Sequence, residues 1–371
     1  MKQPRFLQLF ARNLLEHLGS ETGAFRLTRS VFNAKFPARN GRMWDVAAEL
    51  KCSGRSEPAT LLVECRKQVS PAIAIGMLDA SASVPSGASM VLFSPSISPR
   101  VAEICRQRHV SYLDAAGNCL LRAAGLYIER SGRDNVRRDT RPLRRLFSEK
   151  SSRVIRALLT EPHKGWQVQE LAAVAEVSLG LASKVKQALL TQAYATKRDR
   201  LLFVRDPGAL LAAWTGAYRA RAEAVRLFVP GTATQAEMAV AGWLEAHSVR
   251  FALTQYSGAW RTAPMVRLSR ATMWVEPLPP GVWTDFKRTT NGERVESGEN
   301  IVLWQTDDPA VFDGSRPLGE PPLPTVSPLQ LYLDLKLLVG RGEEAAEAIY
   351  DREIAPKFEN ARPRAVRGTP A

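Results

Sequence analysis

Apolar residues in the first third of the chain recur with two different spacings. Steps of three and four residues over 5–18 predict an amphipathic helix. Helices are also expected at 70–82 and 98–109, the latter with Ser98 as N-cap and Pro99 as its first residue. Short apolar runs predict strands at 42–50, 59–66, 90–93, 110–113, 119–122 and 127–129. Strands that alternate with helices indicate an α/β domain over residues 1–130.

The pattern changes to a helix-rich order over residues 148–205. Helices are expected at 151–160, 169–175 and 178–191, with a short extended segment at 165–168. Ser178 is the expected cap of the third helix, and the polar turn 197–200 separates two short apolar strands. This order of helices and strands is that of a winged helix-turn-helix, which we predict here.

A third pattern begins at residue 206 and predicts an α+β domain over 206–354. Helices are expected near 210–218, 234–246, 329–338 and 343–350, and strands at 225–229, 249–255, 265–268 and 272–276. The basic tail at 355–371 is expected to be disordered. The predicted fold class is therefore a multi-domain α/β protein.

Length and composition exclude several classes of protein. The 371 residues are 45 % hydrophobic and 24 % charged, as in ordinary globular proteins. No apolar stretch approaches the roughly 18 residues of a membrane span, and the polar start does not resemble a signal peptide, so a cytoplasmic location without membrane contact is expected. The four cysteines form no CxxC pair and the four histidines lack ligand spacing, so neither a metal site nor a cofactor is expected.

The positive charge is concentrated in the first 205 residues. Of the net charge of +14, residues 1–150 carry +11, residues 151–205 carry +5 and residues 206–371 carry −2. Such asymmetry favours a polyanionic partner, here double-stranded DNA. A solvated basic surface without a partner is the alternative.

An arginine-rich linker is expected at 131–147. Seven arginines fall within the sixteen residues 130–145. We expect phosphate contacts from five of them: Arg137, Arg138, Arg141, Arg144 and Arg145. A connector that is only flexible is the alternative.

The third helix of the predicted winged helix carries small and polar residues at its start. Leu181, Val185, Ala188 and Leu189 are expected to face the core, which leaves Leu179 and Gly180 with the polar positions for the DNA groove. The residues expected to contact DNA are Ser178, Ser183, Lys184, Lys186 and Gln187 on the helix, and Lys197, Arg198 and Arg200 on the hairpin. A winged helix that binds another protein is the alternative.

Two carboxylates lie at the ends of neighbouring predicted strands in the first domain. Asp45 is on one strand and Glu64 ends the next, with Arg66 two residues further on the same face. The arrangement resembles the restriction-endonuclease-like PD-(D/E)xK fold, in which two carboxylates bind Mg²⁺ and a lysine follows. Arg66 replaces that lysine, so a degenerate site is expected, and Mg²⁺ is implied only if the domain is an active nuclease. A simple surface pairing of Glu64 with a nearby arginine stays open.

Three further segments resemble the AbiEi family of antitoxins and transcriptional regulators of AbiE-type toxin–antitoxin systems. They are Val177–Val185 with Asp206–Trp214, Glu299–Trp304, and Val326–Leu335 with Gly340–Glu347. The resemblance covers residues 148–350. It implies DNA binding by the winged helix, repression of a nearby promoter, and neutralisation of a nucleotidyltransferase-like toxin by the C-terminal domain. The preceding basic α/β domain departs from a compact member of that family.

Three functions follow as hypotheses. The first is a sequence-specific, DNA-binding transcriptional regulator of the antitoxin type. The second is a Mg²⁺-dependent DNA nuclease that uses Asp45 and Glu64. The third is a protein-binding antitoxin module in which DNA contact is incidental. The oligomeric state is open, with a homodimer among the options.

Overall fold

The structure, a computed structural model, describes residues 5–35, 43–54, 56–79, 84–123, 125–133, 146–220, 222–262 and 270–359. The chain forms two compact units, residues 1–142 with 187–193, and residues 143–186 with 194–371. No helix in these described ranges is long and apolar enough to cross a membrane. The chain is a mixed α/β protein with several sheets, as the alternation of helices and strands predicted.

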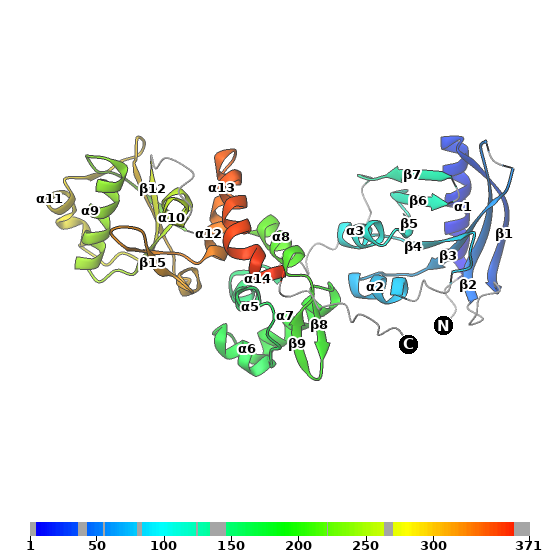
Figure 1. Ribbon diagram of the computed structural model, residues 1–371, viewed down its shortest axis with the longest axis horizontal. Coiled ribbons are helices and arrows are strands. Elements are labelled where there is room, and N and C mark those ends of the chain that lie inside the picture. The colour runs from blue at the N-terminus through cyan, green and yellow to red at the C-terminus, as the bar shows by residue number, and fades with distance from the viewer. Residues whose placement is uncertain are drawn as a thin grey trace, which may run out of the picture. The chain divides into compact units, whose positions relative to one another are not determined.

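The first unit is a seven-stranded sheet with helices on both faces (Figure 1). Its elements are α1 (Arg5–Thr22), β1 (Phe25–Lys35), β2 (Met43–Cys52), β3 (Ala59–Cys65), α2 (Pro71–Asp79), β4 (Ala88–Ser94), α3 (Pro99–Gln107), β5 (Ser111–Asp114), β6 (Cys119–Ala123) and β7 (Leu126–Arg130). The strands lie side by side in chain order; β3, β4 and β5 are parallel, and the other neighbours are antiparallel.

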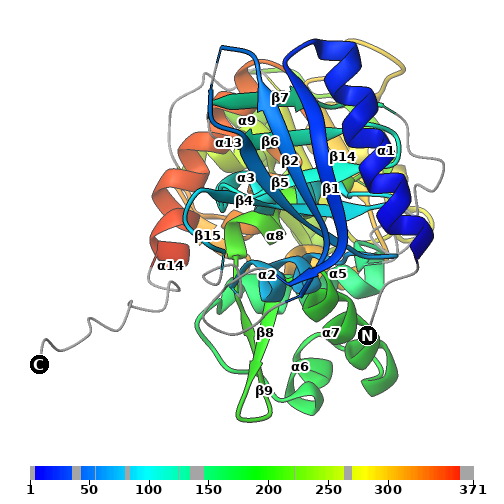
Figure 2. The ribbon, with the colours of Figure 1, turned by 90° about the vertical axis from the view of Figure 1, so that its right-hand side faces the viewer.

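Alternate residues of the central strands build two separate cores. Leu61 and Val63 of β3 pack on the face that α1 covers, whereas Leu62 packs on the face of α2 and α3. This follows from the two-residue period of a strand. Figure 2 shows α1 lying across the first of these faces. Ser98 caps α3 by accepting a hydrogen bond from the Val101 amide, as its position before Pro99 predicted.

Strand β1 was not predicted from the sequence. Its eleven residues pair with β2 along nearly their whole length, with a register shift between Leu27 and Arg29. Phe25 and Ala34 are buried, and Leu27 and Phe32 are half-buried and packed against the core. The register shift and the polar residues between these positions interrupt the apolar alternation, which is why the sequence pattern did not reveal the strand.

The second unit begins with three helices and a hairpin, except that residues 187–193, at and after the end of α7, group with the first unit. These are α5 (Glu149–Thr160), α6 (Val168–Val174), α7 (Leu179–Thr191), β8 (Ala195–Arg198) and β9 (Leu201–Val204). The order and approximate bounds agree with the elements expected over 148–205. Trp166 forms a two-hydrogen-bond bridge with Leu202, which ties the segment between α5 and α6 to the hairpin.

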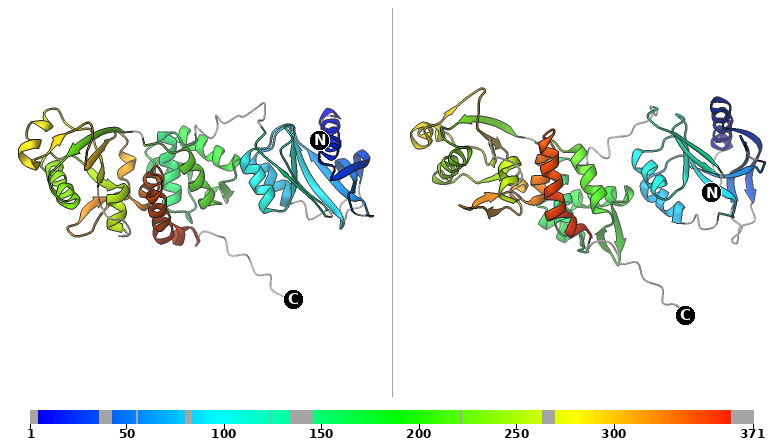
Figure 3. Two further views of the ribbon diagram at one scale, coloured as in Figure 1. Left: turned by 90° about the horizontal axis from the view of Figure 1, so that it is seen from above. Right: turned by 45° about the horizontal axis from the view of Figure 1, so that its top comes forward.

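A second seven-stranded sheet follows. Its elements are α8 (Pro207–Ala217), β10 (Glu223–Phe228), α9 (Ala233–Ala246), β11 (Phe251–Thr254), α10 (Gln255–Thr262), β12 (Ala271–Val275), α11 (Phe286–Thr290), β13 (Glu293–Arg294), β14 (Ile301–Gln305), β15 (Arg316–Leu318), β16 (Leu323–Thr325), α12 (Pro328–Leu335), α13 (Arg341–Ile349) and α14 (Ala355–Glu359). The strand order is β13-β10-β14-β12-β11-β16-β15. Helix α9 packs on one face through Val240 and Leu244, and α12 and α13 lie side by side (Figure 3).

Several expectations for this region need correction. The tail expected to be disordered from residue 355 is helical as far as Glu359, because Phe358 is buried beside Tyr350. The short hairpin β15–β16 was not predicted from the sequence. Strand β14 was not predicted, and the strand expected at 265–268 lies outside the described residues.

The four cysteines are reduced and buried. Burial raises the pKa of Cys65 and of Cys105 to about 12, and that of Cys119 to about 11. We therefore expect the Cys65 and Cys105 thiols of the native protein at pH 8 to react with a thiol reagent roughly a thousandfold more slowly than a free cysteine. All four thiols should react at once in denaturant. Rapid labelling of Cys65 in the native protein would contradict the packing described here.

Candidate nucleic-acid interface

Helix α7 begins where the sequence predicted, but its buried stripe is shifted. The Ser178 hydroxyl accepts a hydrogen bond from the Leu181 amide at 3.3 Å, which caps the helix. Val185 and Leu189 are buried as expected. Leu181 and Ala188 are only half-buried, and Ala182 is fully buried instead.

The opposite side of α7 is accessible. We call it the reading face; its residues are Leu179, Gly180, Ser183, Lys184 and Gln187. All are exposed except Ser183, which is half-buried. At about 100° per residue these positions fall within an arc of about 140°. A Cβ built on Gly180 would meet no atom within 4 Å, so the backbone itself is open there.

Lys186 and Ser178 lie at the edges of the reading face. Lys186 is half-buried, so it is less accessible than Lys184. The Ser178 hydroxyl already accepts the capping hydrogen bond.

The β8–β9 hairpin lies beside this helix (Figure 2). Its turn residues Asp199 and Arg200 both have positive φ, 47° and 70°, as a two-residue type I′ turn requires. Lys197, Arg198 and Arg200 are exposed. None of the three forms an ion pair with another residue in the part of the chain that the structure describes. Gly165 fits closely under Phe203 of the hairpin, where a Cβ would lie 2.4 Å from the ring.

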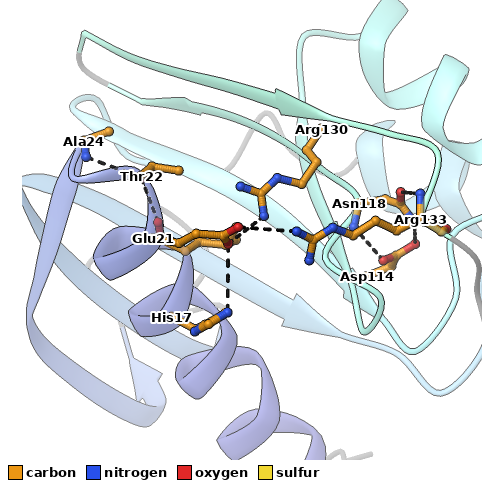
Figure 4. A network of polar contacts seen from close by, with 9 residues as sticks. His17, Glu21, Thr22, Ala24, Asp114, Asn118, Arg130 and Arg133 are labelled. Carbon is orange, nitrogen blue, oxygen red and sulfur yellow. Dashed lines mark hydrogen bonds and ion pairs between the residues drawn. The ribbon is translucent and has the colours of Figure 1, made fainter.

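Two arginines near the expected linker are engaged in structural contacts instead (Figure 4). Arg130 and Arg133 lie 2.8 and 3.4 Å from the carboxylate of Glu21 on α1. The hydrogen bond from Arg130 lowers the pKa of Glu21. Arg133 is also held by two backbone hydrogen bonds with the Asn118 side chain, which in turn binds Asp114. The other arginines expected to contact phosphate, Arg137, Arg138, Arg141, Arg144 and Arg145, lie outside the described residues.

The carboxylates Asp45 and Glu64 are brought together as the sequence predicted. The register pairs Val46 with Val63, which places them on adjacent strands at one end of the sheet. Arg66 contacts Glu64 through Nη2 and lies 3.9 Å from Asp45 through Nη1. Asp45 also accepts hydrogen bonds from the Cys65 amide at 2.8 Å and from Gln8 of α1 at 3.4 Å.

This cluster differs from a simple surface pairing. Glu64 is 7 % exposed, so the expectation of a surface carboxylate is wrong, although its arginine partner is found. The single positive charge of the Arg66 guanidinium lies close to both carboxylates. Within the described ranges no three acidic, histidine or cysteine side chains gather as metal ligands.

Sequence reasoning missed a buried polar network around Asp334. This carboxylate is fully buried and accepts four hydrogen bonds, from Tyr218, Gln330, Thr254 and Trp274, at 2.6–2.8 Å. Burial raises the pKa of Asp334, and the four donated hydrogen bonds oppose that shift. Its partners come from the end of α8, from α12, from β11 and from β12.

The network continues to the first helix of the unit. The Gln330 carbonyl oxygen accepts a hydrogen bond of 2.5 Å from the buried Arg156 of α5. The Arg156 guanidinium also lies over the Trp214 ring, with Cζ 5.4 Å from its centroid. A second link joins Arg153 of α5 to Asp308 at 2.8 Å. The four-residue spacing of Gln330 and Asp334 within an apolar helix was the signal that could have revealed this network.

The comparison with protein families assigns the C-terminal part of the chain. Residues 203–355 match the family described as a transcriptional regulator, AbiEi antitoxin, of a type IV toxin–antitoxin system. The match runs from β9 to the first residue of α14 and includes Gln330 and Asp334, but not α5, α6 or α7. It confirms the family resemblance over these residues. Comparisons with curated proteins and with solved structures gave no match.

We predict that Tyr218→Phe destabilises the second unit by about 1–2 kcal/mol. The change removes the hydroxyl that donates to Asp334 and accepts from Gln330, so two buried groups lose a partner. Urea unfolding of the full chain measures the effect. Tyr256→Phe is the matched control, because the Tyr256 hydroxyl makes no hydrogen bond with the described residues. Equal stability of the two variants would contradict a stabilising role for the network.

Proposed function

We propose that the protein is a DNA-binding transcriptional regulator of the antitoxin type. The observation that carries the proposal is the exposed reading face of α7 beside a hairpin whose cations form no ion pair with the described residues, followed in the chain by the segment that matches the AbiEi antitoxin family. The order α5, bridge, α6, α7 and β8–β9 is that of a winged helix-turn-helix, with the hairpin as its wing.

In this proposal α7 enters the major groove of double-stranded DNA. The groove is about 12 Å wide and admits a helix, and the open backbone at Gly180 allows a close approach. Gln187 has the donor and acceptor that pair with an adenine edge, and Ser183 and Lys184 reach bases or phosphates. Lys186 and Ser178 contact the backbone at the edges of the face.

The wing supplies contacts that do not depend on sequence. Lys197, Arg198 and Arg200 are exposed and bind phosphates or the minor groove. The arginines proposed to contact phosphate from the linker extend the same footprint. A homodimer would place two α7 helices on two half-sites, about one helical turn of DNA apart.

The C-terminal segment is proposed to bind the toxin. Residues 206–371 carry a charge of −2, which suits a protein surface better than a phosphate backbone. The toxin proposed is nucleotidyltransferase-like. A protein whose only role is to neutralise that toxin would need neither the reading face nor the wing.

A Mg²⁺-dependent nuclease in the first unit is the second candidate, because Asp45 and Glu64 do lie together. The Arg66 guanidinium between them weighs against it. We therefore propose that a nuclease-like domain without cleavage activity adds electrostatic contact to DNA.

Lys184→Ala tests the proposed DNA contact. We expect weaker binding to the DNA upstream of the gene and a plot of log affinity against log salt that is shallower by about one. Fluorescence anisotropy at several salt concentrations measures both quantities. Lys164→Ala is the matched control, since Lys164 is held 2.9 Å from Glu170 and its pKa is raised by that contact. Salt-independent affinity, or equal effects of the two variants, would overturn the proposal.

Addition of Mg²⁺ to the same mixtures tests the nuclease candidate. We expect the DNA to stay intact on a gel, because Arg66 occupies the space between the two carboxylates. Degradation that appears only with Mg²⁺ and disappears in Glu64→Ala would instead assign the first unit a nuclease activity.

A further inference from the structure

Leu179 is an exposed leucine on a face that is otherwise small or polar. It is the first residue of α7, and half of its surface is accessible. Its neighbours on the reading face are Gly180, Ser183, Lys184 and Gln187. Exposing a leucine costs free energy that scales with its apolar area.

The position of Leu179 on the helix is specific. Leu179, Ser183 and Gln187 follow one another at four-residue steps and so form a single stripe along α7. The residues at the start of such a helix are the ones that contact base edges. Gly180, the residue after Leu179, has no side chain that would keep the start of α7 away from a groove. Leu179 is therefore the first residue of the stripe at the end of α7 that would approach the groove.

Only one base edge in the major groove offers an apolar group. Thymine carries a 5-methyl there, whereas the other bases present hydrogen-bond donors and acceptors. A leucine can make no hydrogen bond, and against any other base edge it would cover polar atoms without replacing their water. The neighbouring Ser183 and Gln187 can satisfy the polar edges.

We propose, on the basis of the DNA-binding function above, that Leu179 recognises the 5-methyl group of a thymine in each half-site. It thereby acts as a specificity-determining residue. The cations of α7 and of the wing supply affinity for any DNA, and Leu179 supplies discrimination at one base pair. Thymine is distinguished from cytosine and from uracil by the same contact.

Replacement of single thymines by deoxyuridine tests this inference, because it removes the methyl group and nothing else. The protected site is first located by footprinting on the upstream DNA, and each thymine in it is then replaced in turn. We expect one thymine per half-site at which the replacement weakens binding of the native protein about fourfold, the value of one buried methyl group. Binding to 5-methylcytosine at that position should be stronger than binding to cytosine.

Three variants complete a double-mutant cycle. Leu179→Ala should bind the thymine and deoxyuridine sites equally, and Leu179→Met should keep the preference because it keeps an apolar side chain. Lys184→Ala is the matched control on the same face, and it should weaken binding to both DNAs while leaving their ratio unchanged. Thermal unfolding checks that the exposed substitutions leave the fold intact.

The outcomes separate the two proposals. Specific binding that no deoxyuridine replacement weakens, or an unchanged ratio in Leu179→Ala, overturns the role of Leu179 and leaves the regulator in place. A native protein that binds upstream DNA no better than unrelated DNA overturns both.

Discussion

The buried Arg156 guanidinium sets the position of the proposed DNA-reading module. A buried charge without partners costs several kcal/mol, so α5 is held where Gln330 and the Trp214 ring meet Arg156. Gln330 is held in turn by Asp334, whose other donors are Tyr218 after α8, Thr254 on β11 and Trp274 on β12. This chain of contacts joins the helix before α6 and α7 to the segment that matches the antitoxin family. The relative placement of these parts within the second unit therefore depends on a few polar side chains.

Much of the architecture follows from local patterns. Ser98 before Pro99, and Ser178 before an apolar periodic run, both mark helix starts that the structure contains. Apolar runs mark β3 and β4 because both faces of these strands are buried. The proximity of Asp45 and Glu64 was also predictable, because strands that adjoin in an antiparallel pair bring the start of one beside the end of the other.

The features that escaped prediction depend on contacts distant in sequence. The apolar pattern of β1 is interrupted by polar residues and by a register shift, and the strand is recognised by its pairing with β2. The partners of Asp334 lie 60 to 116 residues away, except Gln330. Arginine spacing also could not predict that Arg130 and Arg133 form ion pairs with Glu21. Glu21 lies on α1, more than a hundred residues earlier. Composition counts such charges without revealing which are already paired.

This distinction between paired and accessible charges bears on how the proposed interface achieves specificity. Lysine and arginine attract any phosphate backbone, so the basic excess of the first 205 residues gives no preference for one sequence. Preference must come from the side chains that reach base edges, and on α7 the candidates are Leu179, Ser183 and Gln187, with Lys184 where it contacts a base. The contacts that give affinity for any DNA and those that give specificity are thus made largely by different residues of one small module. A change in net charge alters the affinity for any DNA with little effect on the preference for one sequence. A change at Leu179 alters that preference.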